Sequence, residues 1–335
     1  MHNSRTSVTR PARRALTLAG LSVAVAFAAT GATATRALAA PVAVRAFALG
    51  GDSLASLGVV RGTTAAPEID GVIDSLRGRS GKLRARFVAP ARDLLLAVLE
   101  RVLGDSAAHP GVYLLGDSAG ERRPFSFITL LPFTTKSGGR VENYRVGFWP
   151  AERRRARAPE YENPAGFIRV TADNQDTQVS EHFRLRDFLT HDQQDVWPKY
   201  LVLREELVDK LELVIDDLRA HGVRVEQLRV MSGFRTPEYN QQGVGRGGRA
   251  RDSRHQFGDA ADVYVDNNGD GRMDDLNRDG RVDTRDAQVI LDAVERVELA
   301  HPDLVGGAGR YRATRAHGPF AHVDVRGTRV RWRNG

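Results

Sequence analysis

Residues 253–262 read Ser253-Arg254-His255-Gln256-Phe257-Gly258-Asp259-Ala260-Ala261-Asp262. The imidazole of His255 and the carboxylate of Asp262 stand seven residues apart, and both can reach one metal ion if the chain turns at Gly258 and continues as a strand. The third ligand must come from elsewhere in the chain. His322 is the natural candidate because it lies in the strand-like segment 320–325.

Cysteine is absent from the 335 residues, of which 41% are hydrophobic. This excludes disulfides, thiolate metal sites, iron–sulfur clusters and a cysteine nucleophile, so a metal here must be held by His, Asp or Glu. A catalytic zinc takes three such ligands and leaves its fourth position for water. We therefore expect His255, Asp262 and His322 to bind zinc.

Helix and strand patterns surround these residues. Residues 205–219 are expected to form a helix that ends before Gly222, with its apolar stripe at Leu207, Leu211, Val214, Ile215 and Leu218. A second helix is expected over 287–299, with strands over 228–231 and 262–265 and a final strand over 321–325. The pattern predicts a compact α+β domain over residues 178–330.

Four ordered motifs between residues 179 and 327 resemble the zinc D-alanyl-D-alanine carboxypeptidase family of peptidoglycan peptidases, which shares its fold with the hedgehog signalling domain. They are Ser180-Glu181-His182-Phe183-Arg184-Leu185, Ser232-Gly233-Phe234-Arg235-Thr236-Pro237-Glu238-Tyr239-Asn240 and the two segments that hold the expected ligands. The resemblance implies an antiparallel sheet flanked by helices, with zinc on His255, Asp262 and His322. It also implies that Arg235 holds a carboxylate or carbonyl of the substrate, the alternative being a structural salt bridge.

The general base is not evident from these motifs. Many members of the family carry a Glu shortly before the last zinc histidine, whereas residues 314–321 contain no carboxylate. His317 is the remaining candidate for proton transfer or transition-state stabilisation, and the alternative is a surface histidine. Ser253 and Asp324 are expected to support the ligands, since Asp324 follows His322 by two residues and shares its strand face.

A nine-residue acidic repeat, D-x-N-x-D-G-R-[MV]-D, occupies 266–274 and 275–283. Its spacing resembles the calcium loops of dockerins, with ligands expected in the second copy at Asp275, Asn277, Asp279, Arg281 (through its carbonyl), Asp283 and Asp286. The first copy offers Asp266, Asn268 and Asp270 and is the weaker site. We expect a calcium-binding insertion over 266–286, the alternative being a polar, solvated loop.

The N-terminal segment 1–39 carries five arginines and no Lys, Asp or Glu. It contains an apolar stretch over 15–29 and ends in the small-x-small sequence Ala37-Leu38-Ala39. This predicts an export signal, either of the twin-arginine type at Arg13-Arg14 or an ordinary secretory one. No later segment has the roughly 20 apolar residues of a membrane span. Subtracting the five arginines from the net charge of +7 leaves +2, so nucleic acid is not an expected partner.

The segment between the signal and the α+β domain shows little chemistry. Residues 40–80 have a linker-like composition, whereas 81–177 are expected to form a helix (87–103) and a small β-rich domain with strands in 125–131, 144–149 and 166–170. The basic run 153–157 suits a solvated loop or a contact with wall polymer.

Together these features predict an exported zinc metallopeptidase of the periplasm, cell envelope or extracellular space. Its expected substrate is the stem peptide of peptidoglycan, cleaved as by a carboxypeptidase or an endopeptidase, with calcium as a second metal. The alternatives are a non-catalytic zinc- and calcium-containing module that binds the cell wall, and a calcium-dependent adhesin.

Overall fold

The computed structural model describes residues 42–48, 60–61, 76–89, 109–117, 125–153, 161–245 and 248–334, with backbone alone for 42–48, 60–61, 114–117 and 334. The predicted export signal lies outside the described residues, as does most of the basic run 153–157. Several small sheets and few helices make up the described part, which confirms the α+β class. None of its helices combines the length and apolar character needed to cross a membrane.

The first sheet has the strand order β2-β1-β4-β5-β3. Its strands are β1 (Val42–Ala48), β2 (Val60–Arg61), β3 (Ala85–Val88), β4 (Gly111–Asp117) and β5 (Phe125–Thr129). Only the β3–β5 pair among these is parallel. Two expectations change here: part of the linker-like segment forms β1, and the expected helix over 87–103 is wrong at its start, where residues 87–88 belong to β3. Residues 90–103 lie outside the described part.

A second sheet joins β6 (Leu131–Pro132), β9 (Gly166–Val170) and β10 (Lys199–Leu201), and the pair β7 (Arg140–Val141) and β8 (Tyr144–Arg145) lies nearby in sequence. The β9 and β10 strands pair although they fall on opposite sides of the predicted domain boundary at residue 177. Buried side chains on both sides, among them Trp149, Phe167 and Tyr200, belong to one hydrophobic core. The predicted boundary therefore falls inside a shared sheet and core.

The third sheet has the order β11-β12-β14-β13-β15. Its strands are β11 (Leu228–Ser232), β12 (Ala260–Val265), β13 (Gly307–Tyr311), β14 (Phe320–Asp324) and β15 (Val330–Asn334). All neighbours pair antiparallel except β13 and β15, which are parallel. The strand predicted over 321–325 is therefore not the last one, because β15 follows it at the sheet edge.

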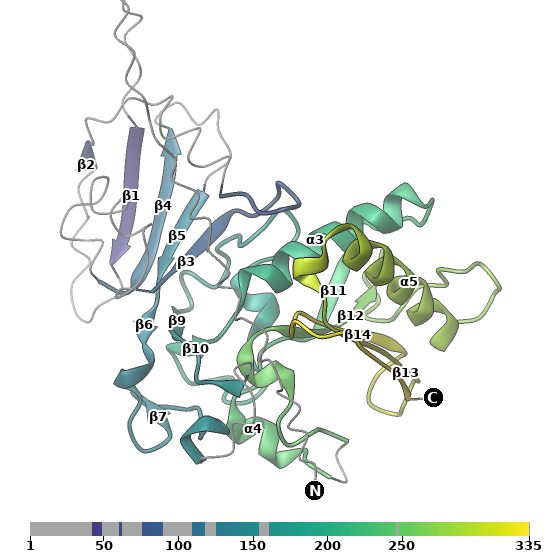
Figure 1. Cartoon of the computed structure of the whole chain (residues 1–335). Coiled ribbons are helices and arrows are strands. Elements are labelled where there is room, and N and C mark those ends of the chain that lie inside the picture. The colour runs from purple at the N-terminus through teal and green to yellow at the C-terminus, as the bar shows by residue number, and fades with distance from the viewer. Residues whose placement is uncertain are drawn as a thin grey trace, which may run out of the picture. The chain divides into compact units, whose positions relative to one another are not determined.

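Helices α3 (Glu205–Ala220) and α5 (Thr284–Ala300) pack against each other, and α5 also contacts β13 and β14 (Figure 1). The predicted apolar stripe of α3 is buried, and Gly222 adopts a φ of 77° just after the helix. Asp283 and Asp286 form a reciprocal cap at the start of α5, which explains why this helix begins three residues before the predicted position. The short helix α4 spans Pro237–Gln242, and 3-10 turns occur at Phe133–Thr135, Ala151–Arg153, Leu185–Phe188, Arg254–Phe257 and Pro302–Leu304.

Strand alternation gives the third sheet two different faces. Ala261 and Val263 of β12, Ala321 and Val323 of β14, and Ala308 of β13 belong to the hydrophobic core. Successive side chains of a strand point to opposite faces, so Asp262 and His322 point away from that core. This alternation places the two predicted ligands on one face of the sheet.

Candidate metal centre

Three elements bring the predicted ligands together. His255 lies in the 3-10 turn Arg254–Phe257, Asp262 in β12 and His322 in β14, and Asp262 is directly paired with His322. Gly258 makes the turn between the first two with a φ of 65°, and a Cβ there would come within 2.2 Å of the carbonyl oxygen of Val202. The predicted turn at this position therefore requires glycine both for its backbone conformation and for the close approach of the neighbouring chain.

The three side chains converge on one point. His322 Nδ1 lies 2.9 Å from Asp262 Oδ1 and 3.2 Å from His255 Nε2, and His255 Nε2 lies 3.3 Å from Asp262 Oδ1. Tetrahedral ligands at the usual zinc distances of about 2.0–2.1 Å are about 3.3 Å apart, so the spacing of these donor atoms fits a zinc ion. All three side chains are buried, and we call them the triad.

The hydrogen bonds behind the triad fix the state of each imidazole. His255 Nδ1 is 2.7 Å from the carbonyl oxygen of Gly233, and His322 Nε2 is 3.2 Å from Asp324 Oδ2. A carbonyl or carboxylate oxygen can only accept, so these nitrogens carry the protons. In the neutral form of each ring, the opposite nitrogen then presents its lone pair to the triad centre, which is the state that metal binding requires.

The charges of the triad favour a cation. Burial lowers the pKa of His255 to about 4, although Asp262 opposes this effect. Burial also disfavours the charged form of His322, but its hydrogen bonds to Asp262 and Asp324 outweigh burial and raise its pKa to about 9. Burial works against a charged Asp262 as well, yet His255 and His322 hold its pKa well below the usual range. Without metal, His322 therefore also carries a proton on Nδ1 at neutral pH, and this second ring proton must leave before Nδ1 can bind a metal.

Asp324, predicted to support His322, is fully buried behind it. Besides His322 it binds the guanidinium of Arg326 through both oxygens and accepts the backbone N–H of Gly307 at 2.6 Å. These contacts fix the carboxylate from several directions, so its position orients the imidazole. Ser253 is also buried, but among the described residues its side chain makes no hydrogen bond to the triad.

Arg235 follows β11 and touches the triad from the other side. Its Nη2 donates to Asp262 Oδ2, the oxygen turned away from the histidines, and its Nε donates to Ser232 Oγ at 2.8 Å. The salt bridge considered for this residue is therefore present. Its Nη1 takes part in neither bond, so the guanidinium borders the triad and keeps a donor for another group.

His317 lies in the loop before β14. Its Nδ1 is 2.8 Å from the carbonyl oxygen of Gly318, and its ring meets the ring of Phe320 edge-on at 5.0 Å. No hydrogen bond links His317 to the triad among the described residues. Phe320 precedes His322 by two residues on the same strand, so His317 packs on the triad's face of the sheet without being part of the triad.

The acidic repeat forms two similar turns. In the first, Asp266 accepts backbone N–H groups of residues 269–271, and in the second, Asp275 accepts those of residues 279–280. The buried Asp286 accepts N–H groups of residues 276, 277 and 283. Arg285 pairs with two further predicted calcium ligands of the second copy, Asp279 and Asp283. Across the described residues, the carboxylates of 266–286 form no second group of three that converges as the triad does.

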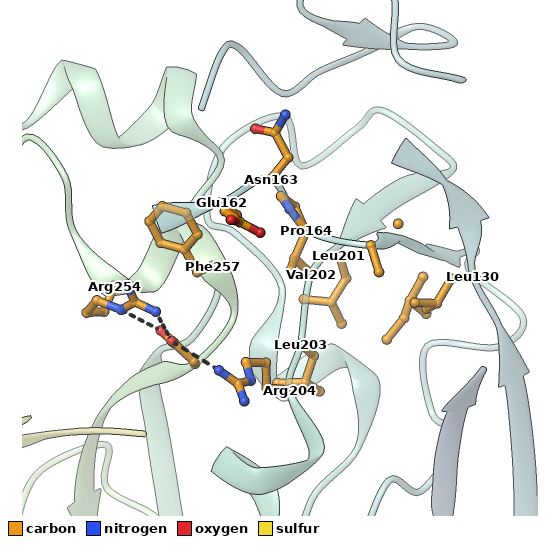
Figure 2. Close-up of a pocket in the computed structure, with 14 residues that line it drawn as sticks. Leu130, Glu162, Asn163, Pro164, Leu201, Val202, Leu203, Arg204, Arg254 and Phe257 are labelled. Carbon is orange, nitrogen blue, oxygen red and sulfur yellow. Dashed lines mark hydrogen bonds and ion pairs between the residues drawn. The ribbon is translucent and has the colours of Figure 1, made fainter. Parts of the chain in front are cut away.

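A cavity of about 360 Å³ lies beside the segment that carries the predicted ligands His255 and Asp262 (Figure 2). Apolar side chains such as Leu130 and Phe257 line it, and at one side the Nε of Arg254 donates to Asp259 Oδ1 at 3.2 Å. No triad residue lines this cavity, so it is separate from the metal centre. The buried ion pair nevertheless bridges the turn between the first two ligands and stabilises the segment that carries them.

Trp332 was not predicted from the sequence as a residue of the site, yet its ring centroid lies 5.1 Å from that of His322. It stands on β15, the strand that was not predicted, in the alternating sequence Val330-Arg331-Trp332-Arg333. That alternation is the signal that could have revealed a strand here. Its position beside the triad could not be inferred from the pattern alone.

Comparisons of the chain with models of protein families, with curated proteins and with solved structures find no match.

Proposed function

We propose that the chain is an exported zinc metallopeptidase that hydrolyses peptide bonds in the stem peptides of peptidoglycan, as a carboxypeptidase or an endopeptidase. The observation that carries the proposal is the triad. Its three donor atoms lie 2.9–3.3 Å apart, and His255 Nε2 and His322 Nδ1 face its centre while the other ring nitrogens bond to outer partners. The motif resemblance adds the substrate class. We propose also that the third sheet, together with α3 and α5, has the fold shared by the zinc D-alanyl-D-alanine carboxypeptidases and the hedgehog signalling domain.

His255, Asp262 and His322 would hold the zinc ion. Zinc bound there would acidify a water molecule and polarise the carbonyl group of the scissile bond. Arg235 neutralises the outer oxygen of Asp262 and keeps Nη1 for a carbonyl or carboxylate of the substrate. Asp324 keeps the His322 ring in its orientation through the Nε2 hydrogen bond.

His317 is the proposed proton carrier. Because its Nδ1 faces a carbonyl oxygen, that nitrogen carries the proton in the neutral ring and Nε2 keeps a lone pair. An imidazole in this state can accept a proton at Nε2 and release it to a leaving amine. The edge-on contact with Phe320 restricts the ring on the triad's face of the sheet.

Calcium is proposed as a second metal, bound by the second copy of the acidic repeat. Asp275, Asn277 and Asp279 follow one another at the spacing of a calcium loop, and Gly280 adopts a φ of 80° at the turn. Asp286, at the last position of the loop, also caps α5. Calcium bound there would stiffen the insertion that begins four residues after Asp262.

A digest of purified muropeptides, resolved by mass, tests the proposal because the mass lost identifies the bond that is cut. We expect cleavage by the zinc-loaded protein and at least a thousandfold loss in His255→Ala. His221→Ala is the matched control, since this exposed histidine at the end of α3 has no contact with the triad and should leave the rate unchanged. No new amine in the presence of zinc, or equal rates for wild type and His255→Ala, would refute a peptidase.

The non-catalytic wall-binding module is the second candidate. The observation that favours it is the position of His317, which contacts Gly318 and Phe320 but, within the described residues, forms no hydrogen bond to the triad. Such a module would bind intact muropeptides in its zinc-loaded form, and the digest would show no change in their mass.

A further inference from the structure

Trp332 belongs to the same row of the sheet as the ligands. Asp262 is paired with His322, His322 with Gly309 and Gly309 with Trp332, so one line of paired residues crosses β12, β14, β13 and β15. Directly paired residues point to the same face of a sheet. The indole of Trp332 therefore lies on the triad's face, at the edge strand.

Gly309 allows the indole to reach the triad. A Cβ on this residue would come within 2.3 Å of Trp332 Nε1, so the ring occupies the space that a side chain on β13 would fill. The ring centroid lies 5.1 Å from that of His322, and Nε1 donates to the hydroxyl of Tyr311 at 2.9 Å. The indole is thus held against a metal-binding imidazole.

Other aromatic rings continue this surface. Tyr311 is paired with Phe320, and their rings stack at 4.6 Å with an angle of 5°, while His317 meets Phe320 edge-on. Trp332, Tyr311 and His317 are partly exposed and Phe320 is nearly buried. We call these four residues the aromatic wall. It borders the triad on the β15 side.

The two sides of the triad differ in chemistry. On the β11 side the guanidinium of Arg235 touches Asp262. On the β15 side the guanidinium of Arg326 lies 5.7 Å from the indole ring and is engaged with Asp324. A ligand held at the triad would therefore meet a cation on one side and an apolar aromatic surface on the other.

We propose that the aromatic wall is a subsite that receives an apolar side chain of the ligand next to the metal, and that Trp332 determines this specificity. The inference rests on the proposed zinc site, and it selects an uncharged apolar residue over a charged one on the β15 side of the scissile bond. Burial of each methylene-sized group against the wall increases affinity about fourfold. Tyr311 acts as a positioning residue that keeps the indole in place.

Hydroxamate binding to the cobalt-substituted full chain, followed by visible absorption, tests the subsite without any turnover. We expect wild type to bind benzohydroxamate at least tenfold more tightly than acetohydroxamate, because part of the phenyl ring contacts the wall. Trp332→Ala should reduce this preference to less than threefold, and Trp332→Phe should restore part of it. Arg333→Ala is the matched control, because this exposed neighbour points to the opposite face of β15 and should keep the preference.

Gly309→Ala provides a second variant, because it keeps the indole but forces it away from His322, and it should also reduce the preference. Equal affinities in wild type, or a preference that survives in both Trp332→Ala and Gly309→Ala, would overturn the subsite while leaving the zinc peptidase intact. A muropeptide digest that shows no cleavage, together with the expected wild-type hydroxamate preference and its loss in Trp332→Ala, would refute the peptidase and support the subsite. A wild-type chain that shows no cobalt absorption would overturn both.

Discussion

Zinc added to the metal-free protein at pH 7.5 should displace close to one proton, and His322 is its source. This imidazole lies between Asp262 Oδ1 at 2.9 Å and Asp324 Oδ2 at 3.2 Å, and these contacts raise its pKa to about 9. At pH 7.5 such a group is about 97% protonated, whereas an ordinary histidine with a pKa near 6.5 would be about 10% protonated. His255, with a pKa of about 4, contributes no proton.

The same competition sets the pH dependence of zinc affinity. His322 must lose its proton before Nδ1 can bind the metal, so affinity should rise about tenfold for each pH unit up to about pH 9 and then level off. Between pH 6.5 and 8.5 the predicted gain is therefore about a hundredfold. A triad with ordinary histidines would instead reach its plateau near pH 7.

Isothermal titration calorimetry in two buffers of different ionisation enthalpy measures the displaced protons directly. Wild type and the control His221→Ala should both release at least about 0.9 proton at pH 7.5, of which His322 supplies the first and a zinc-bound water any excess. Asp324→Asn removes one of the two carboxylates that raise the pKa of His322, so it should release fewer protons and lose about 10- to 100-fold in zinc affinity. Release of less than about 0.3 proton by wild type would refute a protonated His322 in the metal-free protein.

Three further predictions concern the segments that support the site. Gly258→Ala should destabilise the fold by about 2 to 4 kcal/mol in urea denaturation, because its φ of 65° and the 2.2 Å approach to Val202 leave no room for a Cβ; unchanged stability would contradict this packing. Asp286→Ala should cost about 2 to 4 kcal/mol even without calcium, since it leaves three backbone N–H groups without their acceptor, and a thermal melt with less than a 2 °C shift would count against it. Removing calcium from the zinc-loaded protein should lower the melting temperature by several degrees, and readdition should restore it, whereas an unchanged melting temperature would rule out the calcium loop.

The helices and the ligand-bearing strands of the third sheet were predictable because their signals are local. The stripe of α3 repeats at helical spacing, and the alternation of β12 separates Ala261 and Val263 from Asp262. Phe87 and Val88, at the start of the predicted helix, were assigned wrongly because a short apolar run fits a buried strand and a helix equally well. Its place in the first sheet depends on pairing with β5, about forty residues later.

The edge strand β15 shows the limit of local patterns in a different way. Val330 and Trp332 alternate with arginines as in a strand, but its parallel pairing with β13 is a long-range property that alternation does not contain. Only this pairing places Trp332 opposite Gly309 and beside His322. The sequence therefore allowed the convergence of the triad to be predicted but not the surface that borders it.

The two hydrogen bonds that orient the histidines also differ in whether the sequence marks the partner residue. Asp324 could be predicted as the partner of His322, because residues two apart on one strand share a face. The partner of His255 is a backbone carbonyl, which every residue possesses, so no residue type marks it.

Gly233 holds this position because a Cβ there would come within 2.7 Å of the Cα of Phe188. Its lack of a side chain lets the backbone pack closely, and that packing brings the carbonyl oxygen to 2.7 Å from His255 Nδ1. The glycine of the Ser232-Gly233-Phe234-Arg235 motif thus contributes to the proposed metal site through its backbone, and a larger residue there should weaken the proposed zinc binding.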